Sequence, residues 1–190
     1  MAGKYDTSEF RNGLKVEIDG QPFVVVYFQF VKPGKGTAFT RTKLKNMITG
    51  SVIDPTFRTG EKVDAAEVDE IEMQYLYADG DNHWFMNLEN GEQLPVNSKA
   101  IEEESKYFID GVMVKILFFK GKAINVELPN FIEDVIEYTE PSVRGNTATG
   151  ATKSAKLACG ASVQVPLFVE QGETIRVDTR TAEYVARVKK

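Results

Sequence analysis

The sequence predicts a mainly β protein made of three small β-barrel units in succession. Short alternations of apolar and polar residues fill most of the 190 residues, as in half-buried strands. Turn dipeptides containing glycine separate these stretches at close intervals. Only one segment, 98–111, has the pattern of a helix. We expect the units to occupy residues 1–62, 63–128 and 129–190.

The first unit is expected to be a strongly bent barrel. The stretch LKVEIDGQPFVVVYFQF alternates around Asp19-Gly20, which is a two-residue hairpin signal. After VKPGKG, the stretch TAFTRTKLKNMI alternates again. Because strand side chains alternate between faces, this pattern predicts Phe39, Arg41, Lys43 and Lys45 on one face and residues 38, 40, 42 and 44 on the other.

The second unit contains three strand-like pieces separated by ADGD and ENGE. The predicted helix follows, with Ser98 as its cap and Gly111 as its end. Two further strands are joined through Lys120-Gly121-Lys122. Five strands with one intervening helix suit a Greek-key barrel of the oligonucleotide-binding (OB) type.

The third unit begins with the strand NFIEDVIEYTEP and continues through a polar, glycine-rich loop into further strands. Its length and its pattern of strands and turns are close to those of the second unit. A duplicated barrel fold is therefore the expectation for this segment.

Composition excludes a membrane protein and argues against a secreted one. No run of about 18 apolar residues is present, and the N-terminal MAGKYDTSEF lacks the apolar core of a signal peptide. Cys159 is the only cysteine, so an intrachain disulfide cannot form, which favours a reducing compartment. We expect a cytoplasmic protein that does not engage a membrane.

The net charge of −5 conceals a strong segregation along the chain. Residues 1–62 carry a net charge of +4, residues 63–128 carry −9, and residues 129–190 carry zero. A basic end on an acidic protein predicts a local contact with an anionic partner. The acidic middle unit is expected to stay away from RNA phosphate.

No catalytic or metal-binding constellation is visible. His83, the only histidine, has no nucleophile or carboxylate pattern around it, so a surface or hairpin role is expected. With one histidine and one cysteine, the chain cannot form a zinc site made of His and Cys ligands. Cys159 is expected to be inert. The loop RGNTATGAT has glycines spaced as in a phosphate-binding loop, but Ala151 occupies the position of the required lysine. We predict no enzyme, no cofactor and no metal.

The basic end concentrates on one predicted hairpin. Lys32, Lys35, Arg41, Lys43 and Lys45 lie within fourteen residues, with no acid among them. One interpretation is a solvated edge strand that lysines protect from aggregation.

The tip of this hairpin favours a second interpretation. Gly34 and Gly36 permit positive φ on both sides of Lys35, and Pro33 stiffens the approach from Lys32. The hairpin is then a device that presents Lys35 to an anionic partner.

The sequence also resembles a known family. VKPGKGTAFTRTKLKNMITG, YLYADG, PNFIEDVIEYTEP and SVQVPLFVEQGETIRVDTRTAEYVARV are similar to bacterial translation elongation factor P over the whole chain. The resemblance implies an L-shaped monomer with an SH3/KOW-like barrel followed by two OB-fold barrels. It implies a factor that contacts both ribosomal subunits between the exit and peptidyl sites. Such a factor positions peptidyl-site tRNA to stimulate peptide bond formation and relieves stalling at consecutive prolines.

The resemblance also implies roles for particular residues. Lys35 matches the family's tip residue, which a modifying enzyme extends in many bacteria, and Arg41, Lys43 and Lys45 would bind RNA. Arg144, Gly145, Asn146 and Thr147 match a loop that faces the exit-site codon and small subunit, where Asn146 replaces the family's aspartate. Tyr184 and Arg187 are candidate RNA contacts of the third unit.

An alternative stays open at the level of sequence. The chain could be a free-standing RNA-binding module of OB folds that does not act at the ribosomal peptidyl-transferase centre. The related initiation factor 5A carries its modified lysine beside a glycine and a histidine, whereas no histidine is present at this tip.

Overall fold

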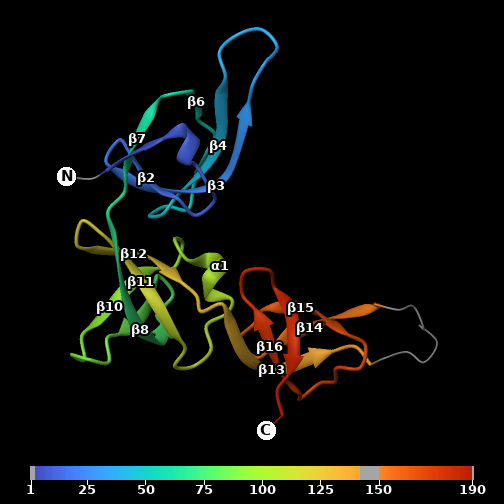
Figure 1. Cartoon of the computed structure of the whole chain (residues 1–190). Helices are drawn as coiled ribbons and strands as arrows, with labels where there is room; N and C mark the ends of the chain where they lie inside the picture. Colours follow the sequence, from blue (N-terminus) through green and yellow to red (C-terminus); the bar gives the residue numbers. More distant parts are fainter. Residues whose placement is uncertain (1–2, 142–149, 190) are drawn as a thin grey trace.

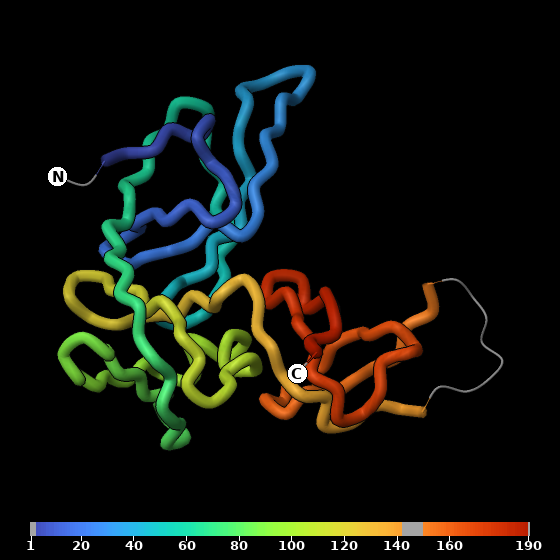
Figure 2. The backbone as a smooth tube through the Cα atoms, turned by 60° about the horizontal axis from the view of Figure 1, so that its bottom comes forward, coloured from blue at the N-terminus to red at the C-terminus, as the bar shows by residue number. Residues whose placement is uncertain are grey.

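The computed structural model describes residues 3–141 and 150–189. The chain forms three β units arranged as an L (Figure 1). The first and second units make one limb, and the third lies to the side of the second. A long hairpin of the first unit extends away from the other two units, as the tube in Figure 2 also shows.

The first unit holds one strongly bent sheet. Its elements are β1 (Lys4–Asp6), the 3-10 turn η1 (Thr7–Glu9), β2 (Lys15–Ile18), β3 (Gln21–Val31), β4 (Phe39–Asn46), β5 (Val52–Ile53), β6 (Thr56–Arg58) and β7 (Lys62–Ala65). The strand order is β1-β7-β2-β3-β4-β5, and β6 pairs with the outer half of β4. Asp19 and Gly20, with φ values of 51° and 76°, close the β2–β3 hairpin as predicted.

The burial pattern of β4 agrees with the predicted alternation. Thr40, Thr42 and Leu44 are buried, whereas Arg41 and Lys43 are exposed. The inner face packs on a small core formed by Phe10, Leu14, Val16, Phe23, Val25, Leu44 and Val63. The last strand of this sheet ends at Ala65 and the next sheet begins at Val68, a few residues after the expected division at 62.

The second unit is a five-stranded sheet in the order β10-β9-β8-β11-β12. Its elements are β8 (Val68–Ala78), β9 (Asn82–Met86), β10 (Gln93–Asn97), α1 (Glu102–Ser105), β11 (Met113–Phe119) and β12 (Lys122–Glu127). Lys120 and Gly121, with φ values of 49° and 77°, connect the last two strands, and Lys122, predicted to be part of this connection, is the first residue of β12.

The predicted helix over 98–111 is wrong in length and in its cap. The helix α1 is a single turn that starts after Ile101 and has no side-chain cap. Ser98 lies in a preceding turn, where the Ala100 amide donates to Asn97 O and the Ile101 amide donates to Ser98 O. Ala100 and Ile101 are almost fully buried, so packing of these side chains under the sheet overrides the helical pattern of the local sequence.

The third unit is a closed five-stranded barrel. Its strands are β13 (Phe131–Thr139), β14 (Thr152–Leu157), β15 (Ser162–Pro166), β16 (Thr174–Asp178) and β17 (Glu183–Arg187), in the order β13-β14-β15-β17-β16. The pairing of β15 with β17 is parallel, and the other pairings in this barrel are antiparallel.

The first and second units share a small apolar cluster of their own. It contains Met47 from the end of β4 and Leu117, Phe119 and Ile124 from the second sheet. The Asn125 side chain, 8% exposed, donates from Nδ2 to Met47 O at 3.0 Å and to Ala100 O at 3.5 Å. Ion pairs at the rim join Lys15 to Glu70 at 3.2 Å and Lys120 to Glu17 at 2.9 Å.

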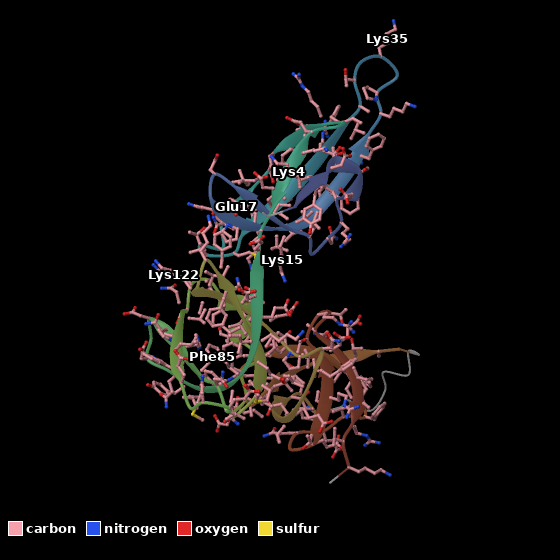
Figure 3. All side chains as sticks on the ribbon, turned by 60° about the vertical axis from the view of Figure 1, so that its left-hand side comes forward. Lys4, Lys15, Glu17, Lys35, Phe85 and Lys122 are labelled. Atoms are coloured by element: carbon pink, nitrogen blue, oxygen red, sulfur yellow. The ribbon has the colours of Figure 1, made fainter. Side chains whose placement is uncertain are left out.

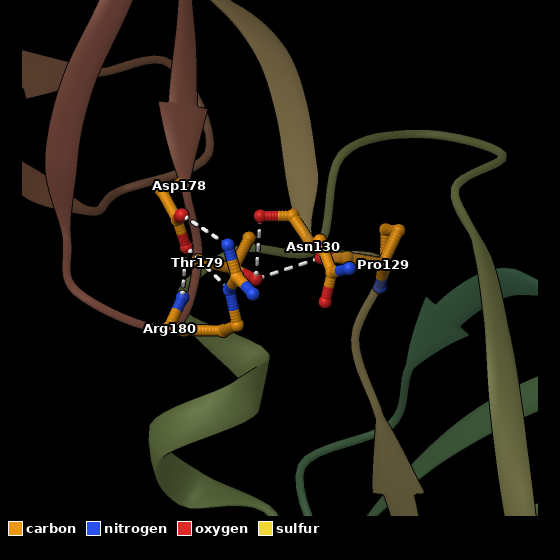
Figure 4. Close-up of polar contacts among 5 residues, drawn as sticks. All are labelled: Pro129, Asn130, Asp178, Thr179 and Arg180. Atoms are coloured by element: carbon orange, nitrogen blue, oxygen red, sulfur yellow. Dashed lines mark hydrogen bonds and ion pairs between the residues drawn. The ribbon is translucent and has the colours of Figure 1, made fainter.

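The second and third units are joined at the start of β13. Thr179 Oγ1 donates to Pro129 O at 2.7 Å, and the Thr179 amide donates to Asn130 O at 3.0 Å (Figure 4). The neighbouring Asp178 and Arg180 form an ion pair at 2.6 Å. One continuous apolar core runs through both units, from Met73 and Phe85 to Ile175 and Val177. This continuity fixes the corner of the L.

Asn125→Ala should loosen the joint between the first two units. The substitution leaves the Met47 carbonyl without a donor in a buried place, which costs about 1–3 kcal/mol. At about 2–4 °C per kcal/mol for a chain of this size, we expect Tm to fall by several degrees in a thermal scan. Asn12→Ala, at an exposed asparagine of the first unit, is the matched control, and an equal Tm for the two variants would contradict the role of Asn125.

Candidate functional site

The basic residues predicted to act together lie on the β3–β4 hairpin. Its strands pair from Phe23 opposite Asn46 to Val31 opposite Phe39. Beyond Val25 a β-bulge inserts Val26, so that Tyr27 faces Lys43. Residues 32–38 form the loop that closes the hairpin, at the far end of the first unit (Figure 1).

The β4 side of the hairpin is anchored almost to the loop. Strand β6 pairs with Phe39, Thr40 and Arg41. At the end of this pairing, Ala38 O accepts hydrogen bonds from the amide and the hydroxyl of Thr59, at 3.2 and 2.9 Å. The strand is therefore paired on both edges at Phe39 and bonded on one edge at Ala38, which makes the hairpin a stiff arm rather than an isolated two-stranded ribbon.

Lys35 lies at the tip of this arm and its side chain points away from the rest of the protein (Figure 3). Residues 34–37 are exposed, and Pro33 is half-buried. Of the two flanking glycines only Gly36 adopts a positive φ, of 111°. A Cβ at Gly36 would meet the Pro33 ring at 3.8 Å, whereas a Cβ at Gly34 would meet nothing within 4 Å.

Both glycines permit a positive φ, and the loop uses it at Gly36 and not at Gly34. The chain reverses direction after Lys35, and the proline ring packs beside that reversal. Gly36 alone needs the backbone freedom of glycine.

Arg41 and Lys43 continue the positive charge down the outer face of the arm. The strand register places them opposite Gln29 and Tyr27, and side chains directly opposite share a face. The Arg41 guanidinium lies 5.5 Å from the centre of the Phe39 ring, which orients it on the surface. In the described parts of the chain, Lys32, Lys35, Arg41 and Lys43 form no ion pair.

Lys45 differs from the other cations of the predicted set. It is half-buried at the base of the arm, and its charge acts on Glu103 of α1, whose pKa is lowered mainly by Lys106 and also by Lys45. The structure therefore places Lys45 beside the acidic helix of the second unit, separate from the open face that carries Arg41 and Lys43.

The third-unit candidates fall in two groups. Arg144, Gly145, Asn146 and Thr147 lie outside the described residues. Tyr184 and Arg187 meet at Phe168: the two aromatic rings are edge-to-face with centroids 6.4 Å apart, and the Arg187 guanidinium lies 4.9 Å from the Phe168 ring centre. Arg187 also pairs with Glu173 at 3.1 Å.

Sequence reasoning missed Phe168, Tyr27 and Gln29 as neighbours of the predicted cations. The VPLFVE stretch gave no sign that Phe168 would be 57% exposed. Tyr27 and Gln29 face the cations of β4 only because of the bulge at Val26, and the uninterrupted VVV run hides its position.

His83 and Cys159, for which the sequence indicated no catalytic role, are both partly buried. His83 lies in β9 with its ring near Tyr75 and Phe108, and burial lowers its pKa. Burial raises the pKa of Cys159 to about 11, so its thiol stays protonated at neutral pH. Within residues 3–141 and 150–189 no group of three His, Cys, Asp or Glu could hold a metal ion, and no helix there could span a membrane.

The arm as a whole presents cations without any partner for proton transfer or nucleophilic attack. It can attract and orient phosphate or ribose groups, which is the chemistry of an RNA-binding tip. Its reach is set by the stiffness of the strand pairing behind it.

Comparison with known proteins agrees with this architecture. Residues 6–63 match the family described as the Elongation factor P (EF-P) KOW-like domain, residues 68–126 match the EF-P OB domain, and residues 132–187 match the Elongation factor P C-terminal family. The proteins named Elongation factor P from Moorella thermoacetica and Syntrophomonas wolfei are 52% and 50% identical over 181 residues. Each comparison covers 95% of this chain and 98% of the relative.

Among solved structures, the protein described as eukaryotic translation initiation factor 5A from Methanococcus jannaschii is similar, with a TM-score of 0.50 and 26% identity. The match covers 94% of that protein and 66% of this chain, so a third of this chain has no counterpart in it. The three-unit β architecture, the full-length identity and the three matched domains together establish that this chain belongs to the elongation factor P family of translation factors, which are not enzymes.

Proposed function

We propose that the protein positions peptidyl-site tRNA on the ribosome through Lys35, so that peptide bond formation is stimulated at consecutive prolines. The observation that carries the proposal is the placement of an exposed lysine at the end of an arm paired on both edges of β4. In this proposal the protein binds the ribosome between the exit and peptidyl sites and contacts both ribosomal subunits.

The physical problem at proline runs is one of geometry. Proline is a secondary amine with a fixed φ, which restricts the approach of the reacting groups. Holding reacting groups in a productive arrangement can lower a barrier by several kcal/mol, and each 1.4 kcal/mol is about tenfold in rate. The protein contributes the position of the tRNA acceptor end and no reacting group.

Two regions of charge divide this work. Lys35 contacts phosphate or ribose near the acceptor end, and Arg41 and Lys43 anchor the outer face of the arm on RNA. Contacts with the sugar–phosphate backbone carry no sequence information, so the arm recognises shape rather than bases. Arg144, Gly145, Asn146 and Thr147 face the exit-site codon and small subunit, and Tyr184 and Arg187 supply further RNA contacts.

The proposal also covers the modification of Lys35, the oligomeric state and location of the protein, and the roles of its three units. A lysine ε-amine is a nucleophile once deprotonated, so an enzyme can extend Lys35 with a group that retains positive charge. The factor acts as a monomer in the cytoplasm. The units 1–62, 63–128 and 129–190 serve as tip-bearing, spacing and small-subunit-facing domains.

Lys35→Ala should abolish relief of stalling without affecting the fold, because an exposed tip residue buries almost no surface. The measurement is synthesis of a Pro-Pro-Pro peptide in a reconstituted translation system, with thermal unfolding as the test of folding. Lys32→Ala removes a neighbouring exposed loop cation and should retain most activity. Normal rescue by Lys35→Ala would refute the assignment.

Gly36→Ala and Gly34→Ala should differ in their activity in the Pro-Pro-Pro synthesis assay. Alanine at a φ of 111° costs about 1–3 kcal/mol, so Gly36→Ala shifts the tip and reduces the rate of rescue. Gly34→Ala meets no neighbour and should act as the native protein. Equal activity of both variants would show that the shape of the loop is not what places Lys35.

Arg41→Gln or Lys43→Gln should each weaken tRNA binding and flatten its dependence on salt. One lost phosphate contact reduces the slope of log K against log salt by about 1. Filter binding across a range of salt concentrations measures both quantities. Lys122→Gln, at an exposed lysine of the acidic unit (Figure 3), is the control, and a slope that changes equally in all three variants would argue against anchoring by the arm.

A further inference from the structure

The second unit carries a row of three surface side chains across β8, β9 and β10. The register places Tyr77 opposite Trp84 and Trp84 opposite Pro95, so the three lie side by side on one face of the sheet. The adjacent Phe85 is fully buried, which places Trp84 on the outer face. We call this row the Tyr77–Trp84–Pro95 strip.

The aromatic part of the strip is held in a defined arrangement. The Tyr77 and Trp84 rings are stacked, with centroids 6.1 Å apart and an interplanar angle of 20°, and Tyr77 is 50% exposed. Trp84 Nε1 donates to Asp79 Oδ2 at 2.8 Å. This bond and the Asn82 amide lower the pKa of Asp79, so a charged carboxylate stands at the edge of the indole.

The strands that carry the strip have one sign of charge. Residues 68–97 contain seven Asp or Glu and no Lys or Arg. Among the described residues, only Glu70 of these seven forms ion pairs, with Lys15 and Lys115. The six acids without an ion pair are Asp69, Glu72, Asp79, Asp81, Glu89 and Glu92.

An acidic cleft lies toward the other end of the same strands. It has a volume of about 310 Å³ and is lined by Ile71, Leu88 and Met113 together with Glu70, Glu72 and Glu89. Leu88 is 56% exposed. At about 3.3 Å per strand residue, Glu72 lies roughly 16 Å from Tyr77, the length of about five residues of extended chain.

We propose that the Tyr77–Trp84–Pro95 strip and this cleft together bind an extended, arginine- or lysine-rich segment of a partner protein. One cation lies over the exposed face of the Tyr77 ring, which is stacked on Trp84, and the aromatic quadrupole and Asp79 both attract it. A second cation, about five residues along, enters the cleft between Glu72 and Glu89, and its methylene groups cover Leu88. The same carboxylates repel phosphate, so RNA is not the occupant.

The proposal is independent of the function of Lys35. It concerns the acidic second unit and a cationic partner, whereas Lys35 lies on the basic arm of the first unit and is proposed to bind RNA. Failure of one leaves the other in place.

Trp84 is the only tryptophan of the chain and reports binding at the strip directly. The full chain is titrated with octa-arginine at low salt while the emission of Trp84 is followed. We expect a saturable change that weakens as salt rises. An octa-glutamate peptide and a single-stranded RNA octamer should leave the emission unchanged.

Matched variants locate the contact. Tyr77→Ala and Tyr77→Leu should each weaken binding about tenfold, because both remove the ring and the second keeps an apolar side chain. Tyr138→Ala, at a tyrosine of the third unit that is 57% exposed, should bind as the native chain does. Glu72→Gln should weaken binding severalfold, whereas Glu102→Gln, at an exposed acid of α1, should not.

Three outcomes would overturn the proposal. The first is no saturable change of emission with octa-arginine. The second is equal affinity of the native chain and both Tyr77 variants, which would place the peptide elsewhere on the acidic unit. The third is a saturable response to the RNA octamer, which would assign the strip to nucleic acid.

Discussion

The contact between Met47 and Asn125 sets where the arm can point. Met47 directly follows β4, so the buried hydrogen bond from Asn125 and the cluster of Leu117, Phe119 and Ile124 attach the base of the arm to the second unit. Asn46, the last residue of β4, is itself fixed by its hydrogen bond to Gln21 at 2.6 Å. A small rotation at this joint would become a large displacement at Lys35, because the whole length of the hairpin lies beyond it.

The other joint extends the same constraint to the third unit. Barrels of about 60 residues bury too little surface to be strongly stable alone, and here the second and third share one apolar core. Thr179 bonds to the backbone of both Pro129 and Asn130, the residues that lead into β13. The distance between the tip of the arm and the third barrel therefore depends on buried contacts at two corners, and not on flexible linkers.

The sequence predicted the elements whose pattern is local. The alternation of Arg41 and Lys43 with Thr40 and Thr42, and the tight turns at Asp19-Gly20 and Lys120-Gly121, follow from residue type alone. The reduced helix, the bulge at Val26 and the burial of Lys45 could not be predicted, because each depends on packing against segments distant in the chain. The difference between Gly34 and Gly36 has a related reason: both glycines permit a positive φ, but only the path of the whole loop decides which of them adopts it.

The placement of Lys45 also limits where an anionic partner can approach the arm. Lys45 acts electrostatically on Glu103 of α1, and the base of the arm is attached to the second unit, whose residues 63–128 carry a net charge of −9. Positive charge without a neighbouring acid begins at Lys43 and continues through Arg41 to Lys35. The proposed RNA partner would therefore be attracted to the outer half of the hairpin and repelled from the second unit. In the proposed function, this separation of charge favours an approach of RNA phosphate at the tip, and it leaves the acidic strands for the proposed cationic partner.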